Sequence, residues 1–110
     1  MEENKKIAVS IIRKYIYDLG RRNTYCWNTA EFMQVCYSKI AAKELLNLIE
    51  SNTNLSAETT IENFRNKMDR YALANEHTSL QFSIQHDAAT YILDKLIDYK
   101  ERRINQNGHI

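Results

Sequence analysis

The side chains of this chain that could do chemistry are three histidines, two cysteines and 14 carboxylates. A di-iron site in a helical bundle needs inward-facing Glu-x-x-His pairs, and none of the nine glutamates has a histidine three residues later. All-helical nucleotide pyrophosphohydrolases hold magnesium with Glu-x-x-Glu and Glu-x-x-Asp pairs, and neither spacing occurs. We therefore expect no metal site and no cofactor.

His86 and Asp87 form a His-Asp pair of the kind used by metal-dependent phosphohydrolases. Those enzymes take further ligands from several helices of a larger domain, and this chain has no third histidine in a suitable place. On a helical wheel His86 falls at the edge of an apolar arc near Leu93 and Ile97. We therefore expect a half-buried histidine with one hydrogen-bond partner.

The two cysteines have no catalytic signature around them. A nucleophilic thiol needs a neighbouring base and a lowered pKa. Cys36 falls on the apolar side of a long predicted helix, where we expect an inert core residue, and Cys26 falls in a predicted loop. Only two glycines are present, so no glycine-rich phosphate loop can form. The sequence predicts a protein without enzymatic activity, and a metal or thiol enzyme is the least favoured reading.

The composition favours one all-helical domain over residues 1–110. The 110-residue chain has no proline, only two glycines and no sustained alternation of apolar and polar residues. Long uninterrupted helices need that absence of helix breakers. We predict an all-α fold, a four-helix, mostly antiparallel bundle with short loops.

Start and stop signals divide the chain into four predicted helices. Asn28 precedes Glu31 at the spacing of a capping box, Thr78 opens a second such box, and Ser56 follows a polar turn. Gly20 follows the last apolar residue of the first helix, so we expect a left-handed C-terminal cap there. The four predicted helices span residues 3–19, 29–50, 57–75 and 79–104, and a flexible tail is predicted at about 105–110.

The second predicted helix carries apolar residues around most of its circumference. Phe32, Ile40 and Leu48 fall in neighbouring sectors, so we expect them in the core and this helix at the centre of the bundle. The third and fourth helices have narrower apolar faces that include Tyr71, Ile92 and Tyr99 among others. The polar face of the fourth helix is expected to meet solvent; it carries Asp87, Tyr91, Asp94 and Asp98.

Positive charge is concentrated near the N-terminus. The formal net charge is +1, yet residues 1–43 carry an excess of four positive charges and residues 44–110 an excess of three negative ones. Such an asymmetry is typical of a surface that docks a partner or another copy. The predicted interaction surface comprises Arg13, Lys14, Tyr17, Arg21, Arg22, Tyr25 and Trp27.

Two functions follow as hypotheses. The first is a small non-enzymatic interaction module that self-associates through protein–protein contacts, because the chain has more apolar and aromatic residues than four helices can bury. The alternative is a regulatory protein that binds nucleic acid through its basic N-terminal face, which the sequence pI of about 7.8 disfavours. We expect the two cysteines to be reduced thiols, and no apolar segment is long enough to span a membrane. Together these features predict a cytoplasmic protein with no membrane partner.

Overall fold

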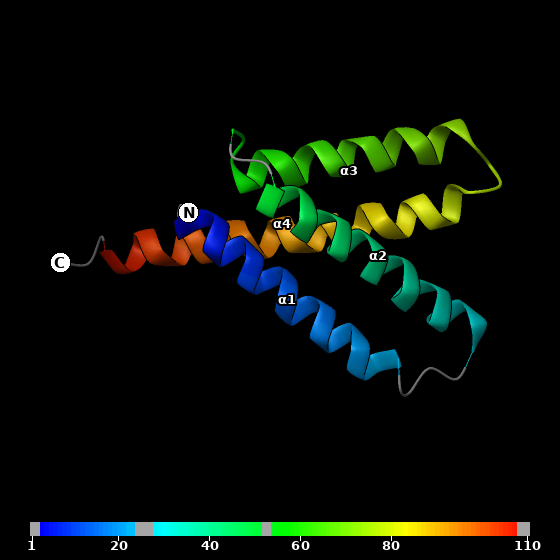
Figure 1. The fold of residues 1–110 in the computed structure, drawn as a ribbon, viewed down its shortest axis with the longest axis horizontal. Helices are drawn as coiled ribbons and strands as arrows, with labels where there is room; N and C mark the ends of the chain where they lie inside the picture. The colour runs from blue at the N-terminus through cyan, green and yellow to red at the C-terminus, as the bar shows by residue number, and fades with distance from the viewer. Residues whose placement is uncertain (1–2, 24–27, 52–53, 108–110) are drawn as a thin grey trace.

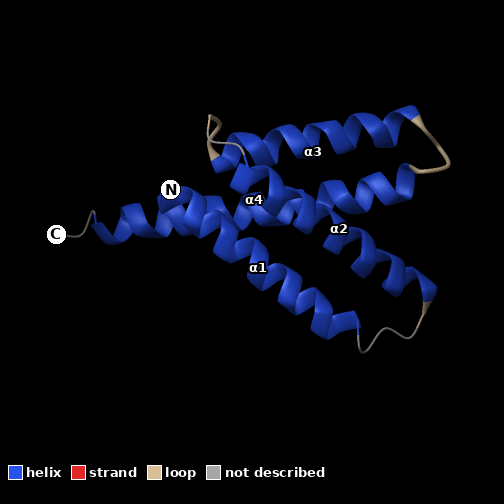
Figure 2. Ribbon diagram, in the orientation of Figure 1, coloured by secondary structure: helices blue, strands red, loops and turns tan. Residues whose placement is uncertain are grey.

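The computed structural model describes residues 3–23, 28–51 and 54–107, and within these ranges the only regular secondary structure is α-helix, joined by short turns such as those at 54–56 and 75–78 (Figure 2). This confirms the predicted all-α, four-helix fold. The long apolar-periodic segments without proline form the helices, as expected from their propensities. The four helices are α1 (Glu3–Asn23), α2 (Thr29–Ser51), α3 (Ala57–Ala74) and α4 (Ser79–Asn107).

The helices form two antiparallel hairpins that cross at an angle (Figure 1). The α3–α4 hairpin has the most extensive contacts, and α4 also packs against both α1 and α2. By contrast, α2 touches α3 only slightly. The second helix was predicted to be the centre of the bundle; both α2 and α4 contact all three other helices, but α4 has the larger share of the contacts through its pairing with α3, so α4 is the most enclosed helix.

The core lies where the inner faces of the four helices meet. Ile92 and Leu96 of α4 are fully buried, as are Ile12 of α1 and Leu45 of α2, and Ile61 of α3 completes the centre. Ala41, Ala42, Ala88 and Ala89 are buried as well, and their small side chains let α2 and α4 approach each other closely. The predicted inner faces of α3 and α4 are confirmed at these positions.

Several apolar side chains that were predicted to be buried are exposed. On α2, Phe32 is 50%, Ile40 48% and Leu48 36% exposed, and on α3 and α4 Tyr71 and Tyr99 are nearly half exposed. Phe32 and Ile40 lie outward because the buried face of α2 is on the other side of the helix, while Leu48 lies at the edge of that face and borders a hollow shared with α3. An apolar wheel position is buried only where a neighbouring helix covers it.

Two of the three predicted N-terminal caps are made. The backbone N–H of Glu31 donates to Asn28 Oδ1 at 2.8 Å, and that of Thr59 donates to Ser56 Oγ at 3.1 Å. At the third, α4 begins as predicted, with Phe82 N donating to the Thr78 carbonyl at 3.1 Å. However, the buried Thr78 hydroxyl has no hydrogen-bond partner within the described residues, so the predicted side-chain cap is not formed.

Gly20 is not a C-terminal cap. It lies inside α1, which continues to Asn23, and its φ is not positive. Arg21 and Arg22 are good helix formers and extend the helix by a turn. Similarly, α4 continues to Asn107, past the predicted start of the tail.

Ion pairs hold the C-terminal half of α4 against its neighbours. Lys100 pairs with Glu58 of α3, and Arg103 pairs with Glu3 of α1 at 2.6 Å. The hydrogen bond and charge of Arg103 lower the pKa of Glu3 below its ordinary value. Both Glu3 and Arg103 are largely exposed, so we expect this pair to orient the helix ends more than to stabilise the fold.

Candidate functional site

The predicted basic surface lies in part on an exposed side of α1. Arg13, Lys14, Tyr17 and Arg21 are all exposed, and their spacing places them within about 100° of one another on the helix. Arg22 is exposed too but borders a hollow on the flank of α1 that faces α4. Tyr25 and Trp27 lie outside the described residues.

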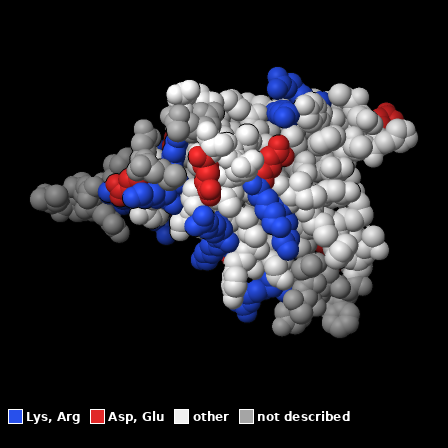
Figure 3. Space-filling model, in the orientation of Figure 1, with Lys and Arg blue, Asp and Glu red and all other residues white. Residues whose placement is uncertain are grey.

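Acidic side chains interrupt this basic surface. The Arg13 guanidinium lies 3.5 Å from Glu50 Oε1 of α2, and both side chains are well exposed to solvent. Figure 3 shows that lysine and arginine side chains on this face form separate groups with acidic side chains beside them. The arrangement is a mixed-charge surface rather than a continuous basic patch.

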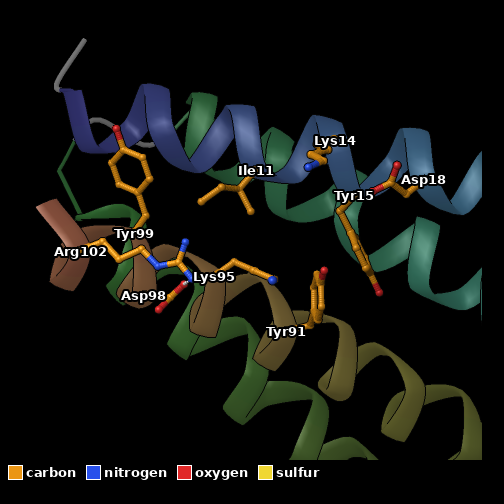
Figure 4. Close-up of a pocket in the computed structure, with 9 residues that line it drawn as sticks. All are labelled: Ile11, Lys14, Tyr15, Asp18, Tyr91, Lys95, Asp98, Tyr99 and Arg102. Atoms are coloured by element: carbon orange, nitrogen blue, oxygen red, sulfur yellow. Dashed lines mark ion pairs between the residues drawn. The ribbon is translucent and has the colours of Figure 1, made fainter.

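A groove runs between α1 and α4 (Figure 4), with a volume of about 370 Å³. We call it the α1–α4 groove. It combines aromatic, basic and acidic side chains from the two helices. Its lining residues are Ile11, Lys14, Tyr15 and Asp18 of α1 and Tyr91, Lys95, Asp98, Tyr99 and Arg102 of α4.

A stacked tyrosine pair closes one end of this groove. The rings of Tyr15 and Tyr91 lie with their centroids 5.0 Å apart and their planes at 29°. Burial raises the pKa of the Tyr15 phenol above its ordinary value, and a hydrogen bond with Ser38 opposes that effect. Beyond the pair lies a second hollow of about 320 Å³ that α2 also lines, through Gln34 and Ser38.

The charges in the α1–α4 groove are only partly paired. Arg102 lies 3.2 Å from Asp98, one helical turn away. The Lys95 ammonium lies over the Tyr91 ring, 5.4 Å from its centroid. Among the described residues, neither Lys14 nor Lys95 has an acidic partner within 4.0 Å, although both line the groove, and Figure 4 shows Lys95 extending toward Tyr91.

Sequence reasoning missed this groove because it assigned the polar face of α4 to solvent. Asp98 lines the α1–α4 groove, Asp87 lines the second hollow beside α1, and Tyr91 lines both. The signal that could have revealed them is Tyr91, a large ring placed among aspartates one and two turns away. A tyrosine has an apolar ring that gains from burial and a hydroxyl that can stay near water, so a tyrosine on a charged helix face indicates contact with a neighbouring element.

A second surface feature lies on α2. Phe32, Ile40 and Leu48 are exposed at eight-residue intervals, and we call them the α2 apolar row. Cys36 lies between the first two and is partly exposed, so the expectation that it is a core residue is wrong. Cys26 lies outside the described residues.

The remaining chemical candidates stay isolated. His86 is about one-third exposed, and its Nδ1 lies 3.2 Å from Asp87 Oδ1, which confirms the expected half-buried histidine with one partner. In the part of the chain that the structure describes, no three His, Cys, Asp or Glu residues converge to hold a metal ion. No helix within those ranges is long and apolar enough to cross a membrane.

Comparison with known protein families, with curated proteins and with solved structures finds no match for this chain. Any functional assignment must therefore come from the α1–α4 groove, the α2 apolar row and the basic surface of α1.

Proposed function

We propose that this protein is a small non-enzymatic helical interaction module whose partner is a second copy of itself. The observation that carries the proposal is the α2 apolar row, in which three large apolar side chains are one-third to one-half exposed on one helix. Single exposed apolar residues are ordinary, but an ordered row of them is typical of a surface that another protein covers.

The spacing of the row suits helix-on-helix packing. Phe32, Cys36, Ile40, Glu44 and Leu48 follow each other at four-residue intervals and form one ridge of α2. Ridges of this type from two helices pack into each other's grooves at about 50°, the commonest packing class. The α2 helix therefore presents a ridge that a second helix of the same kind can accept.

The row is also symmetric about its middle member. Ile40 lies eight residues from both Phe32 and Leu48, so an antiparallel α2 of a second copy would set Ile40 against the partner's Ile40. Phe32 and Leu48 lie about 12 Å from Ile40 along α2 and are turned about 80° from it in opposite senses, so they flank this central Ile40–Ile40 pair and do not face each other. This is the self-complementary contact that a two-fold dimer requires.

Sedimentation velocity and cysteine cross-linking test this proposal. We expect a dimer that Ile40→Asp dissociates, because the charge would sit at the two-fold axis. The matched control is Leu73→Asp, which replaces the 83%-exposed Leu73 of α3 and should leave the dimer intact. A wild-type monomer at high micromolar concentration, or equal effects of both variants, would contradict self-association through α2.

Cross-linking checks the register. In a background with Cys26→Ser and Cys36→Ser, Ile40→Cys should form an intermolecular disulfide on mild oxidation. At an axis separation of about 8–10 Å, the two Cα atoms would lie within the roughly 7 Å limit for a disulfide. Phe32→Cys should not cross-link to itself, because the two copies would be about 24 Å apart along the helix. Efficient cross-linking of Phe32→Cys alone would exclude the antiparallel register.

The alternative function is nucleic-acid binding, which the exposed Arg13, Lys14 and Arg21 of α1 favour. Neutralised phosphates release counter-ions, so binding would weaken by orders of magnitude between about 50 and 200 mM salt. Self-association through an apolar row should change little over the same range. A gel-shift series with DNA and RNA over this salt range, run beside the sedimentation experiment, separates the two functions. We also place the proposed module in the cytoplasm, in keeping with the free thiol of Cys36.

A further inference from the structure

We propose that the α1–α4 groove binds an organic phosphate that carries an aromatic ring, a molecule of mononucleotide size. The groove's volume of about 370 Å³ falls in the range of small-molecule sites, roughly 300–1,000 Å³. The inference rests on two properties that the groove combines, unpaired positive charge and aromatic surface. It is independent of the proposed self-association, since the groove contains no residue of α2.

The positive charge comes from both walls. Lys14 projects from α1 and Lys95 from α4, and neither has an acidic partner within 4.0 Å among the described residues. Two like charges that share a groove repel each other, and an anion between them replaces that repulsion by two attractions. A phosphate supplies up to two negative charges and several acceptor oxygens for such donors.

Arg102 adds a third cation, held by a carboxylate. Its guanidinium lies 3.2 Å from Asp98, and the other acid of the groove is Asp18. The lining side chains therefore carry one net positive charge. A phosphate can compete with Asp98 for Arg102, because guanidinium groups bind phosphate and carboxylate with similar geometry.

The aromatic surface of the groove is the reason for proposing that the ligand carries an aromatic ring. Ile11, Tyr15 and Tyr99 form apolar parts of the lining, and Tyr99 is 46% exposed. The Tyr91 ring is stacked on Tyr15 and has Lys95 near it, whereas among the described residues no ring or cation contact involves Tyr99, so we assign the planar part of the ligand to the Tyr99 ring. Stacking of a base on such a ring is sequence-tolerant and strengthens phosphate binding.

Isothermal titration calorimetry with ADP, inorganic pyrophosphate and adenosine tests the proposal on the full chain. We expect saturable ADP binding and at least tenfold weaker binding of pyrophosphate and adenosine, each of which lacks one half of the ligand. Lys14→Gln and Lys95→Gln should each weaken ADP binding by about tenfold, as expected for a lost charge-assisted hydrogen bond. Asp98→Asn should strengthen it, because it frees Arg102 and removes a negative charge.

The control is Arg70→Gln, which removes an exposed cation of α3 outside the groove and should leave the affinity unchanged. Circular dichroism melts of every variant establish that each is folded. Absence of saturable ADP binding at millimolar concentration overturns the proposal. So do pyrophosphate or adenosine binding as tightly as ADP, or an equal loss with Arg70→Gln. Because Ile40→Asp lies outside the groove, it should bind ADP normally, so this test and that of self-association fail separately.

Discussion

Replacing Gly20 by alanine should stabilise the protein. Gly20 lies within α1, three residues before its end at Asn23, and its φ is not positive. An added Cβ would have no heavy atom within 4 Å beyond its own helix, so alanine meets no clash and gains no packing contact. The remaining effect is the helix propensity of alanine over glycine, about 0.5–1 kcal/mol.

Urea unfolding monitored by circular dichroism measures this change. With a slope of about 1–3 kcal/mol/M for a small domain, the midpoint should rise by about 0.2–1 M. Thermal melts should show a rise of about 2–5 °C, since 1 kcal/mol corresponds to about 4 °C or more at this chain length. The slope itself should stay constant, because the substitution does not change the surface exposed on unfolding.

Gly20→Asn is a control that separates a helical Gly20 from a Gly20 at a left-handed cap, because the two placements predict opposite orders of stability for the alanine and asparagine variants. In a helix interior asparagine is less favourable than alanine by about half a kcal/mol or more. At a left-handed cap, asparagine would instead be tolerated better than alanine. The observation that alanine destabilises the protein, or that asparagine exceeds alanine, would refute the helical placement of Gly20.

Three further predictions concern the core, the caps and a buried phenol. Ile92→Ala should lower the free energy of unfolding by about 2–5 kcal/mol in urea melts, because Ile92 is fully buried. Leu48→Ala, at a 36%-exposed site, should lower it by only about 1 kcal/mol at low protein concentration, and equal losses would contradict the exposure of Leu48. Ser56→Ala should lower the free energy of unfolding by about 1 kcal/mol, because it removes the N-terminal cap of α3. Thr78→Val should leave stability unchanged or raise it, because it removes a buried hydroxyl without a hydrogen-bond partner among the described residues; a marked loss of stability would show that this hydroxyl is bonded. Burial raises the pKa of Tyr15, so the contribution of its neutral phenol to the free energy of unfolding is complete below about pH 10 and is lost as the pH rises above that value. In melts from pH 9 to 11, the stability of Tyr15→Phe should therefore fall less steeply than that of the wild type.

Local signals within the chain determined where the helices lie. Asn28 and Ser56 cap helices through bonds to backbone groups three residues away, so short sequence windows contain all the information needed. The absence of proline and the apolar periodicity then predict four helices, and Ile92 was correctly placed in the core. Helix boundaries at Thr29 and Ala57 agree with the prediction for the same reason.

Only the tertiary structure decided which helix covers which face. A helical wheel shows that Phe32 and Ile40 are apolar, but not that they lie on the side of α2 that no neighbouring helix covers. It shows that Tyr91 and Asp98 share the polar face of α4, but not that α1 runs beside it and encloses a groove. Even the end of α1 beyond Gly20 escaped local reasoning. Periodicity specifies the direction of each side chain from its own helix axis, whereas exposure and pairing depend on the distance and crossing angle of the neighbouring helix.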